Sequence, residues 1–280
     1  GRRIRARGDG NRRHVVAGES RKAAGARRWS VPAERGHHEG MAKTFTPQPN
    51  AAAALQGLSS MATKEVLAQL AQRCTAEGVA IEFESGGGVI MADRVRAGDA
   101  ADLVVLGADA MRTLADEGHV IADSVRPLFR SDMVFAIPDS AEVPDVSSPR
   151  AIRELISGDL RIGYSTGPSG TALLRQLEAW GLRPEIDDRL VQARPGVPVG
   201  RLLTDGEADV GLQQNSELAG MPGVRVLGPL PGECAVTTVF SGGVLAASGR
   251  PDAASGALSR MADPAYSAIV KGCGMTPAGG

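Results

Sequence analysis

Four short stretches rich in Ser, Thr and Gly hold the residues of this 280-residue chain that are best suited to binding a ligand. They lie at residues 59–63, 85–88, 164–171 and 194–200. Hydroxyl groups donate hydrogen bonds, and glycine lets backbone N–H groups come close to a bound molecule. Such stretches predict a site for a small anion that does not depend on Lys or Arg.

Each stretch follows a predicted strand and precedes a predicted helix. In a parallel α/β sheet these turns gather at the carboxyl ends of the strands, where ligands bind. Helix N-termini at this edge offer unpaired N–H groups and a partial positive charge. The alternative is that each Ser or Thr is an ordinary N-cap, but four turns in matching places favour a shared ligand site. The residues expected to bind the ligand are Ser59, Ser60, Ser85, Gly86, Tyr164, Ser165, Thr166, Ser169, Gly196 and Val197.

Two longer side chains are added to this set. Arg130 lies in an extended segment, where it could supply a full positive charge to the ligand or be an ordinary solvated arginine. Gln213 and Gln214 end a predicted strand, where an amide can bind a carboxylate or carbonyl group, the alternative being simple hydration of the strand end. We therefore also expect Arg130 and Gln213 to bind the ligand.

Motifs for catalysis and metal binding are scarce. The chain has no G-x-S-x-G, P-loop or H-E-x-x-H pattern. His119 is the one histidine beyond residue 40, and its place after Gly118 at a predicted helix end favours a capping or solvated role. Cys74, Cys234 and Cys273 are widely spaced without C-x-x-C, which excludes a disulfide framework and a cysteine zinc site. We expect no catalytic residue, no metal and no cofactor.

Short apolar runs alternate with amphipathic helices from residue 53 onward. Strands are predicted at 53–58, 80–84, 102–106, 160–164, 188–192 and 209–213. A helix that starts at Ser59-Ser60 places Val66, Leu67, Leu70 and Cys74 on one face, and others are predicted up to Gly98 and at 108–117, 169–180 and 199–203. This order implies parallel sheets flanked by helices.

A short pattern occurs in both halves of the chain. Residues 96–103 read R-A-G-D-A-A-D-L, and residues 204–210 read T-D-G-E-A-D-V. In each, a helix ends at Gly, an acidic residue and Ala follow, and an Asp opens the next strand. Chance is the alternative in a chain rich in these residues, but the equivalent positions favour two α/β domains of similar build.

Two extended segments, 125–137 and 234–247, are expected to cross between these domains. Domain 1 would then comprise 53–130 with 245–280, and domain 2 would comprise 131–244 with the crossover strands. A last helix at 252–272 would dock on domain 1. The predicted fold class is α/β, with two α/β domains of parallel type joined by two crossover strands and a ligand cleft between them.

The first forty residues differ in charge from the rest. They carry 11 Lys and Arg against 4 Asp and Glu, whereas residues 41–280 carry 20 against 28. They lack helical or alternating apolar periodicity, and no apolar stretch of a signal peptide follows the Arg pairs. A basic arm for nucleic acid or anionic lipid is the alternative to a disordered extension. We expect a disordered basic extension and linker over 1–52.

The composition excludes several function classes for the folded part. Apolar residues make up 42% and charged residues 22%, as in a globular protein. No apolar run approaches the roughly 20 residues of a membrane span. Aromatic residues make up only 3%, which leaves few platforms for stacking single-stranded nucleic acid. We expect neither a membrane span nor nucleic-acid binding there.

Over residues 53–278 the chain resembles the type II periplasmic solute-binding proteins, especially the molybdate-binding-like branch. The resemblance is carried by Ser59-Ser60, Ser85 before a glycine turn, residues 96–105 and Gly274-Met275-Thr276-Pro277. It implies two α/β domains that clamp a ligand by hinge closure. It also implies that Ser59 or Ser60, Ser85, and backbone amides at 165–170 and 197–200 hold an oxyanion.

One departure bears on the ligand. The molybdate-binding branch typically has a Tyr and an Asp after the strand predicted at 209–213, whereas this chain has Gln213-Gln214-Asn215. The amides favour an organic carboxylate over a molybdate-like oxyanion. Some proteins of this fold are aconitate isomerases, so an isomerase of unsaturated di- or tricarboxylates is the alternative function. Its candidate general bases are Glu217, Tyr164 and Asp109.

The resemblance also implies a partner and a location. A transport receptor would deliver its small anionic ligand to an ABC transporter permease and work in the periplasm or at the cell surface. Because no signal peptide is visible, a cytoplasmic sensor or enzyme stays open as the alternative. Three unpaired cysteines fit a reducing compartment without requiring one.

Overall fold

Three apolar runs form parallel strands in the first half of the computed structural model, which describes residues 53–279. Their bounds are β1 (Leu55–Ser60), β2 (Ile81–Gly86) and β3 (Leu103–Gly107). They alternate with the 3-10 helix η1 (Met61–Thr63) and with α1 (Lys64–Ala76), α2 (Gly88–Arg96) and α3 (Ala108–Asp116). We call this region lobe 1. The basic extension and linker expected over 1–52 lie outside the described residues.

A second set of parallel strands forms lobe 2. Its parallel strands are β5 (Ile162–Tyr164), β6 (Leu190–Gln192) and β7 (Val210–Gln214), and lobe 2 also contains β8 (Val224–Pro229). Its helices are α4 (Pro149–Ser157), α5 (Pro168–Ala179), α6 (Arg183–Ile186), α7 (Val199–Thr204) and α8 (Asn215–Leu218). The alternation of strand and helix predicted for both halves is confirmed.

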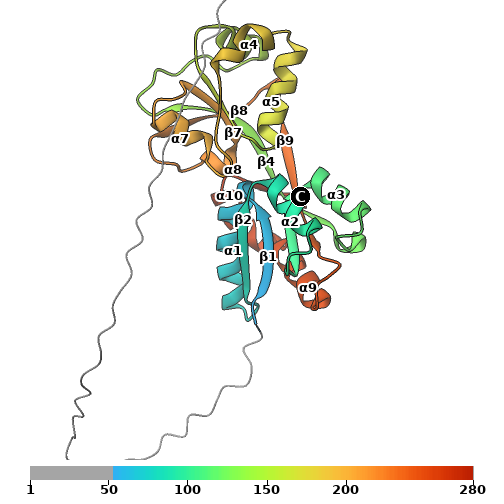
Figure 1. Cartoon of the computed structure of the whole chain (residues 1–280). Coiled ribbons are helices and arrows are strands. Elements are labelled where there is room, and N and C mark those ends of the chain that lie inside the picture. The colour runs from blue at the N-terminus through green and yellow to red at the C-terminus, as the bar shows by residue number, and fades with distance from the viewer. Residues whose placement is uncertain (1–52, 280) are drawn as a thin grey trace, which may run out of the picture. The chain divides into compact units, whose positions relative to one another are not determined.

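Two long antiparallel strands join the lobes (Figure 1). They are β4 (Arg126–Pro138) and β9 (Thr237–Val244), and the strand order is β2-β1-β3-β9-β4-β7-β5-β6. The first part of β4 pairs with β9, and its second part pairs with β7 and β8. The predicted class, two α/β regions joined by two crossover strands, is therefore confirmed.

The strand register shows in which direction the parallel strands of each lobe run. In lobe 1, Gly107 at the carboxyl end of β3 pairs with Phe240, in the middle of β9. In lobe 2, Gln214 at the carboxyl end of β7 pairs with Met133 of β4, whose N–H donates to the Val236 carbonyl just before β9. The parallel strands of both lobes thus end toward the same stretch of the crossover strands, so their carboxyl ends face each other.

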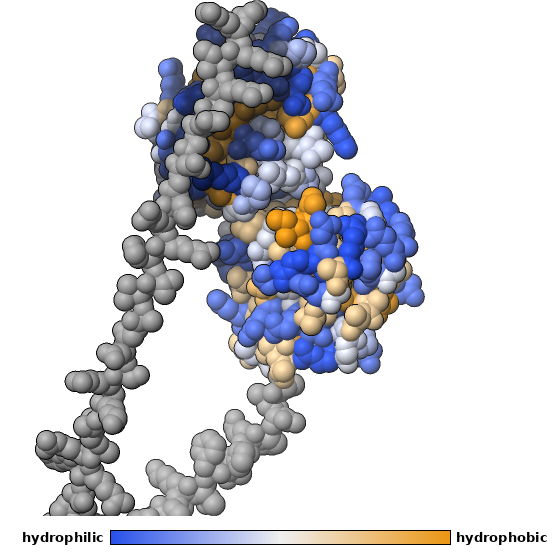
Figure 2. Space-filling view, viewed as in Figure 1, coloured by the Kyte–Doolittle hydropathy of each residue, from blue (hydrophilic) through white to orange (hydrophobic). Residues whose placement is uncertain are grey.

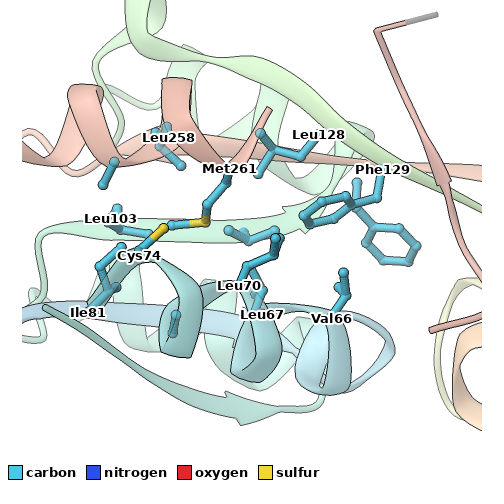
Figure 3. Packing of buried hydrophobic residues seen from close by; sticks show 14 of the residues in the cluster. Val66, Leu67, Leu70, Cys74, Ile81, Leu103, Leu128, Phe129, Leu258 and Met261 are labelled. Atoms are coloured by element: carbon cyan, nitrogen blue, oxygen red, sulfur yellow. The ribbon is translucent and has the colours of Figure 1, made fainter. Parts of the chain in front are cut away.

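Helices cover both faces of each sheet region. In lobe 1, α1 packs with α9 (Pro251–Met261) and α10 (Ser267–Gly272) on one face, while α2 and α3 cover the other. Figure 3 shows Leu70 and Cys74 of α1 near Met261 of α9 in this core. The expected apolar face of α1 is confirmed, since Val66, Leu67, Leu70 and Cys74 are at most 1% exposed. Each such Leu contributes roughly 1.5–3 kcal/mol by leaving water.

Several elements differ from the prediction. The helix expected over 252–272 is broken into α9, the 3-10 helix η5 (Pro264–Tyr266) and α10, because Pro264 cannot continue the hydrogen bonding of α9. The first strand ends at Ser60 and not at Leu58, since Ser59 and Ser60 continue the ladder with β2. The short elements α8, β8 and β10 (Thr276–Pro277) were not predicted.

No helix within residues 53–279 has both the length and the apolar character needed to cross a membrane.

Candidate functional site

Two serines lie side by side where β1 and β2 end. Ser59 and Ser85 are register partners in the parallel pair, and their Oγ atoms lie 2.7 Å apart. Ser59 is fully buried and Ser85 is half-buried. Only one of the two hydroxyl hydrogens can lie between the oxygens, so the other remains available to a third group. The pair can therefore donate a hydrogen bond to an anion at this edge of lobe 1.

Ser60 has a different role. Its Oγ lies 3.4 Å from Thr63 Oγ1, and the Thr63 hydroxyl donates to the Ser60 carbonyl at 3.0 Å. Both residues are buried, so these contacts fix the turn of η1. Gly86 follows Ser85, and a Cβ there would lie 2.3 Å from the terminal methyl of Met91, which restricts this position to glycine unless Met91 moves.

A second serine pair lies where β5 ends in lobe 2. The Oγ atoms of Ser165 and Ser169 are 2.9 Å apart, and the Gly167 N–H donates to Ser165 Oγ at 3.2 Å. Both serines are buried. A Cβ on Gly170 would lie only 1.8 Å from the Ser165 carbonyl oxygen, so glycine is required for α5 to begin this close to the turn. This tight turn holds the two hydroxyls together.

The other predicted residues of lobe 2 are spread more widely. Thr166 is exposed beside the serine pair, whereas Tyr164 belongs to the apolar core of the lobe. Gly196 and Val197 lie on an exposed turn, with Gly196 at a φ of +79° that favours glycine. Arg130 is exposed on β4 between Val239 and Thr276, and it forms no ion pair with any residue of the described range 53–279.

Gln213 lies at the carboxyl end of β7, and Glu217 lies in α8, which follows directly. The buried Gln213 accepts a hydrogen bond from the Val199 N–H through Oε1 at 2.6 Å. Burial raises the pKa of Glu217 to about 7, and the nearby Gln213 amide acts in the opposite direction. A group with a pKa near neutral pH can give or take a proton under ordinary conditions.

The other two candidate bases are placed differently. The Asp109 side chain is 95% exposed and pairs with Arg112 at 3.2 Å, one turn along α3. Tyr164 packs among apolar residues of lobe 2. Glu217 combines a position directly after β7 with a raised pKa.

Gln214 and Thr238 join β7 to the crossover strand β9. Gln214 is 1% exposed, and its Nε2 donates to Thr238 Oγ1 of β9 at 2.6 Å. Its Oε1 is buried without a hydrogen-bond partner among the described residues. The Gln-Gln pair at the strand end is a sequence signal for Gln214, but nothing in the sequence singles out Thr238.

The short helix α8 touches both lobes. It packs against η1 of lobe 1 and against β4, β7 and β8. Asn215 donates to the Gly274 carbonyl at 3.0 Å, and the Ser216 N–H lies 3.3 Å from Ser131 Oγ on β4. Glu217 is therefore carried by an element that contacts both lobes.

Two hollows on the described surface lie away from the strand ends. One is lined by Glu77, Arg260 and Tyr266, and the Tyr266 hydroxyl donates to Glu77 at 2.6 Å. The other is lined by Asp99 and His119, which agrees with a peripheral role for this histidine. Within residues 53–279 no cluster of three or more His, Cys, Asp or Glu residues forms a candidate metal site.

Comparisons with known proteins fit this arrangement. Aconitate isomerase from a Pseudomonas species is 30% identical over 188 residues, which cover 66% of this chain and 71% of that protein. The periplasmic molybdate-binding protein of Azotobacter vinelandii has a TM-score of 0.67 at 18% identity, covering 79% of this chain and 98% of its own. The sulfate-binding protein of Mycobacterium tuberculosis has a TM-score of 0.66 at 15% identity, covering 81% and 87%. At these identities the two structures establish the fold alone.

A family profile covers both lobes. The profile described as bacterial extracellular solute-binding protein matches residues 55–276, from β1 to the start of β10. This confirms the resemblance to solute-binding proteins that the serine turns and the 96–105 segment predict. The chain belongs to the bacterial extracellular solute-binding protein family.

Proposed function

We propose that the facing strand ends of the two lobes bind a small organic carboxylate, held by closure of the lobes about β4 and β9. The observation that carries this proposal is the occurrence of one serine hydroxyl pair in each lobe, Ser59 with Ser85 and Ser165 with Ser169. Hydroxyls donate well to carboxylate oxygens, and charge-assisted bonds of this kind are stronger than neutral ones.

Exposed apolar side chains favour an organic ligand over an inorganic oxyanion. Val89 and Ile90 follow the glycine turn after Ser85, and they are 71% and 49% exposed. Figure 2 shows an apolar patch on the face of lobe 1 where α2 begins. A tetrahedral oxyanion gains nothing from such a surface, whereas the carbon skeleton of a carboxylate can cover it. The relative that acts on aconitate supports the same class of ligand.

As a member of this family, the protein would act as a receptor that hands its ligand to a transporter. The family description supports an extracellular or periplasmic place of work. An ABC transporter permease is the partner that such a receptor requires. Delivery to the permease and the residues that bind the ligand are parts of this proposal.

A thermal-shift screen tests the proposal. The panel contains molybdate, tungstate and sulfate beside succinate, citrate, cis-aconitate and trans-aconitate. A ligand at 100 times its Kd stabilises the folded protein by roughly 2.7 kcal/mol, which is readily measured as a rise in Tm. A shift with a carboxylate and none with the oxyanions is expected. A shift with molybdate alone, or with no anion, contradicts the proposal.

An isomerase acting on an unsaturated tricarboxylate is the second candidate, and Glu217 is the observation that favours it. A base with a pKa of about 7 could take a proton from the methylene carbon next to the double bond. The electrons of that C–H bond would form a new double bond while the old one takes a proton at its far carbon, so nothing is oxidised or reduced.

Proton NMR in D2O separates the two candidates. Purified protein is incubated with cis-aconitate, and the spectra are followed for trans-aconitate and for deuterium at the methylene carbon. Binding without either change identifies a receptor. Turnover that is lost in Glu217→Gln but kept in Glu207→Gln, a change at an exposed residue, identifies the isomerase.

A further inference from the structure

One buried atom at the strand ends has no hydrogen-bond partner. Gln214, the last residue of β7, is 1% exposed, and its Oε1 meets no donor among residues 53–279. Its Nε2 is already used, because it donates to Thr238 Oγ1 of β9 at 2.6 Å. A buried acceptor without a donor is costly and rare in native proteins, so this one points to a bound group that supplies the missing hydrogen.

The bond between the two side chains sets what each can offer to such a group. With the amide reversed, Oε1 would accept from the Thr238 hydroxyl, but the NH2 group would lose its bond to Thr238. Buried amide N–H groups without an acceptor are rarer than amide oxygens without a donor, which favours the present orientation. Because Thr238 Oγ1 accepts from Gln214, its own hydrogen points elsewhere. The pair therefore presents an acceptor beside a donor.

The strand register places Gln214 beside the serine pair of lobe 2. Leu212 pairs with Tyr164 in the parallel strands β7 and β5. Beyond these partners the chain reaches Gln214 on β7, and on β5 it reaches the turn that holds Ser165 and Ser169. Neighbouring strands lie about 5 Å apart, so the backbone of Gln214 lies next to this turn.

The side chain of Thr238 continues the row of strand ends into lobe 1. Its methyl group lies 3.9 Å from the position of a Cβ on Gly107, the last residue of β3. Ser59 is on the neighbouring strand, where it pairs with Val105, two residues before Gly107. Since the strand order runs from β2 and β1 through β3, β9, β4 and β7 to β5, the bond between Gln214 and Thr238 lies between the two serine pairs.

A helix start beside Thr238 can hold a carboxylate. Gly107 is the N-cap of the nine-residue helix α3, and no side chain caps this end. Among the described residues beyond its chain neighbours, only the Thr238 methyl lies within 4 Å of a Cβ at Gly107, which leaves room for a ligand. Asp109, the acid of the first turn, is 95% exposed and pairs with Arg112 at 3.2 Å. The open N–H groups and the helix dipole favour a negative charge here.

We propose that the ligand is a hydroxycarboxylate, whose hydroxyl donates to Gln214 Oε1 while its carboxylate binds at the start of α3 and accepts from the Thr238 hydroxyl. This inference rests on the proposed binding of a carboxylate, and opening of the lobes about β4 and β9 lets the ligand reach the buried amide. An acid without the hydroxyl leaves Oε1 unsatisfied when the lobes close over it, so Gln214 selects against that acid.

Two pairs of acids that differ by one hydroxyl test the proposal, namely citrate against tricarballylate and malate against succinate. Calorimetric titration measures their Kd values at pH 8, where the carboxyl groups of all four acids are ionised. The proteins are wild type, Gln214→Met and Gln72→Met, a control at an exposed residue of α1. In wild type and Gln72→Met, the hydroxy acid of the pair that binds should bind about 10- to 100-fold more tightly. Methionine keeps the length of the side chain but lacks the amide, so this ratio should approach one in Gln214→Met.

The results that would overturn the inference can be told apart. Equal affinities within each pair for wild type, or binding only of acids without a hydroxyl such as trans-aconitate, overturn the inference and leave carboxylate binding intact. A preference for the hydroxy acid that persists in folded Gln214→Met overturns the role of Gln214. Failure of every carboxylate to bind wild type overturns the proposed function and this inference with it. The comparison of acids in wild type needs no variant, so it decides the matter even where Gln214→Met does not fold.

Discussion

Asp102 and Asp209 make the same backbone contacts in the two lobes. The N–H of Asp102 donates to the Gln56 carbonyl at 2.7 Å, and its carboxylate accepts from the Gln56 N–H at 2.9 Å. Asp209 repeats both bonds with Arg161, at 2.9 Å and 2.8 Å. Each Asp thereby ties the start of one parallel strand to its neighbour. This shared geometry gives a physical reason for the sequence pattern that the two halves have in common.

Replacing these carboxylates tests how much each contributes to the free energy of unfolding. Asp102→Asn loses charge-assisted bonds to Arg250 and should lower the free energy of unfolding by about 2 kcal/mol. Asp209→Asn should cost only about 1 kcal/mol, because the Asp209 side chain is 37% exposed against 9% for Asp102. Urea unfolding at pH 7 measures both values. Equal losses of unfolding free energy in the two variants would contradict the explanation that the more buried carboxylate contributes more.

Acid should weaken the protein through the same two residues. Burial acts to raise the pKa of Asp102, but bonds from Arg250, Gln56 and Ser248 outweigh it and hold the pKa below its ordinary value. Bonds from Arg161 lower the pKa of Asp209. The unfolded chain therefore binds more protons than the folded one below about pH 4, and stability falls as pH falls. Urea unfolding at pH 5, 4 and 3 should show a shallower fall for Asp102→Asn than for wild type.

The fold could be predicted because its signals are local. Helical spacing of Val66, Leu67, Leu70 and Cys74, short apolar runs, and glycines after helices marked most elements to within a few residues. Gly98 and Gly206, which end the matching segments, both have positive φ values, 81° and 71°. The break at Pro264 was missed because the apolar pattern continues on both sides of it.

The site could be predicted only in part. Serines before predicted helices identified Ser59, Ser85, Ser165 and Ser169, since such turns must lie at the carboxyl ends of strands. The bond from the Val199 N–H to Gln213 depends on how α7 packs on β7, and the four-residue helix that carries Glu217 has no periodicity to read. The contact between Gln214 and Thr238 depends on strand register across the hinge, which the sequence does not specify.

Loss of a serine hydroxyl should weaken both ligand binding and folding. Ser85→Ala removes a group that we propose to bind the carboxylate directly or through Ser59, so the Kd should rise about tenfold, equivalent to about 1.4 kcal/mol. Because Ser85→Ala also removes the hydrogen-bond partner of the buried Ser59 hydroxyl, the free energy of unfolding should fall by about 1–3 kcal/mol. Ser157→Ala on α4, an exposed serine bonded to the Arg153 carbonyl, is the matched control and should leave the Kd unchanged. An unchanged Kd in Ser85→Ala would remove this serine from the proposed site.

Gly170 should tolerate no side chain. In Gly170→Ala the new methyl would lie 1.8 Å from the Ser165 carbonyl oxygen, so the turn must move, at a cost of about 1–3 kcal/mol. Gly256→Ala in α9 is the matched control, because nothing lies within 4 Å of its Cβ, and it should gain about 0.5–1 kcal/mol. Thermal unfolding measures both changes in stability, the loss expected for Gly170→Ala and the gain expected for Gly256→Ala. If Gly170→Ala also binds the ligand as wild type does, the Ser165 turn is not part of the site.

The bond between Gln214 and Thr238 predicts how firmly the crossover strand β9 holds lobe 2. Thr238→Val leaves the buried Gln214 amide without any partner, since its Oε1 is already unpartnered among the described residues. An unsatisfied buried amide costs about 1–3 kcal/mol, and the free energy of unfolding should fall by that amount. Thr237→Val is the matched control, because it removes an exposed bond to Asp132 and should stay within about 0.5 kcal/mol of wild type. Thr237 and Thr238 are neighbours on β9, and each is replaced by Val in its own variant. Any effect of Val on strand propensity is therefore similar in the two variants and cancels in the comparison. Equal losses of unfolding free energy in the two variants would mean that the Gln214 amide finds another hydrogen-bond partner when Thr238 is replaced. The bond to Thr238 would then not be needed to hold β9 against lobe 2.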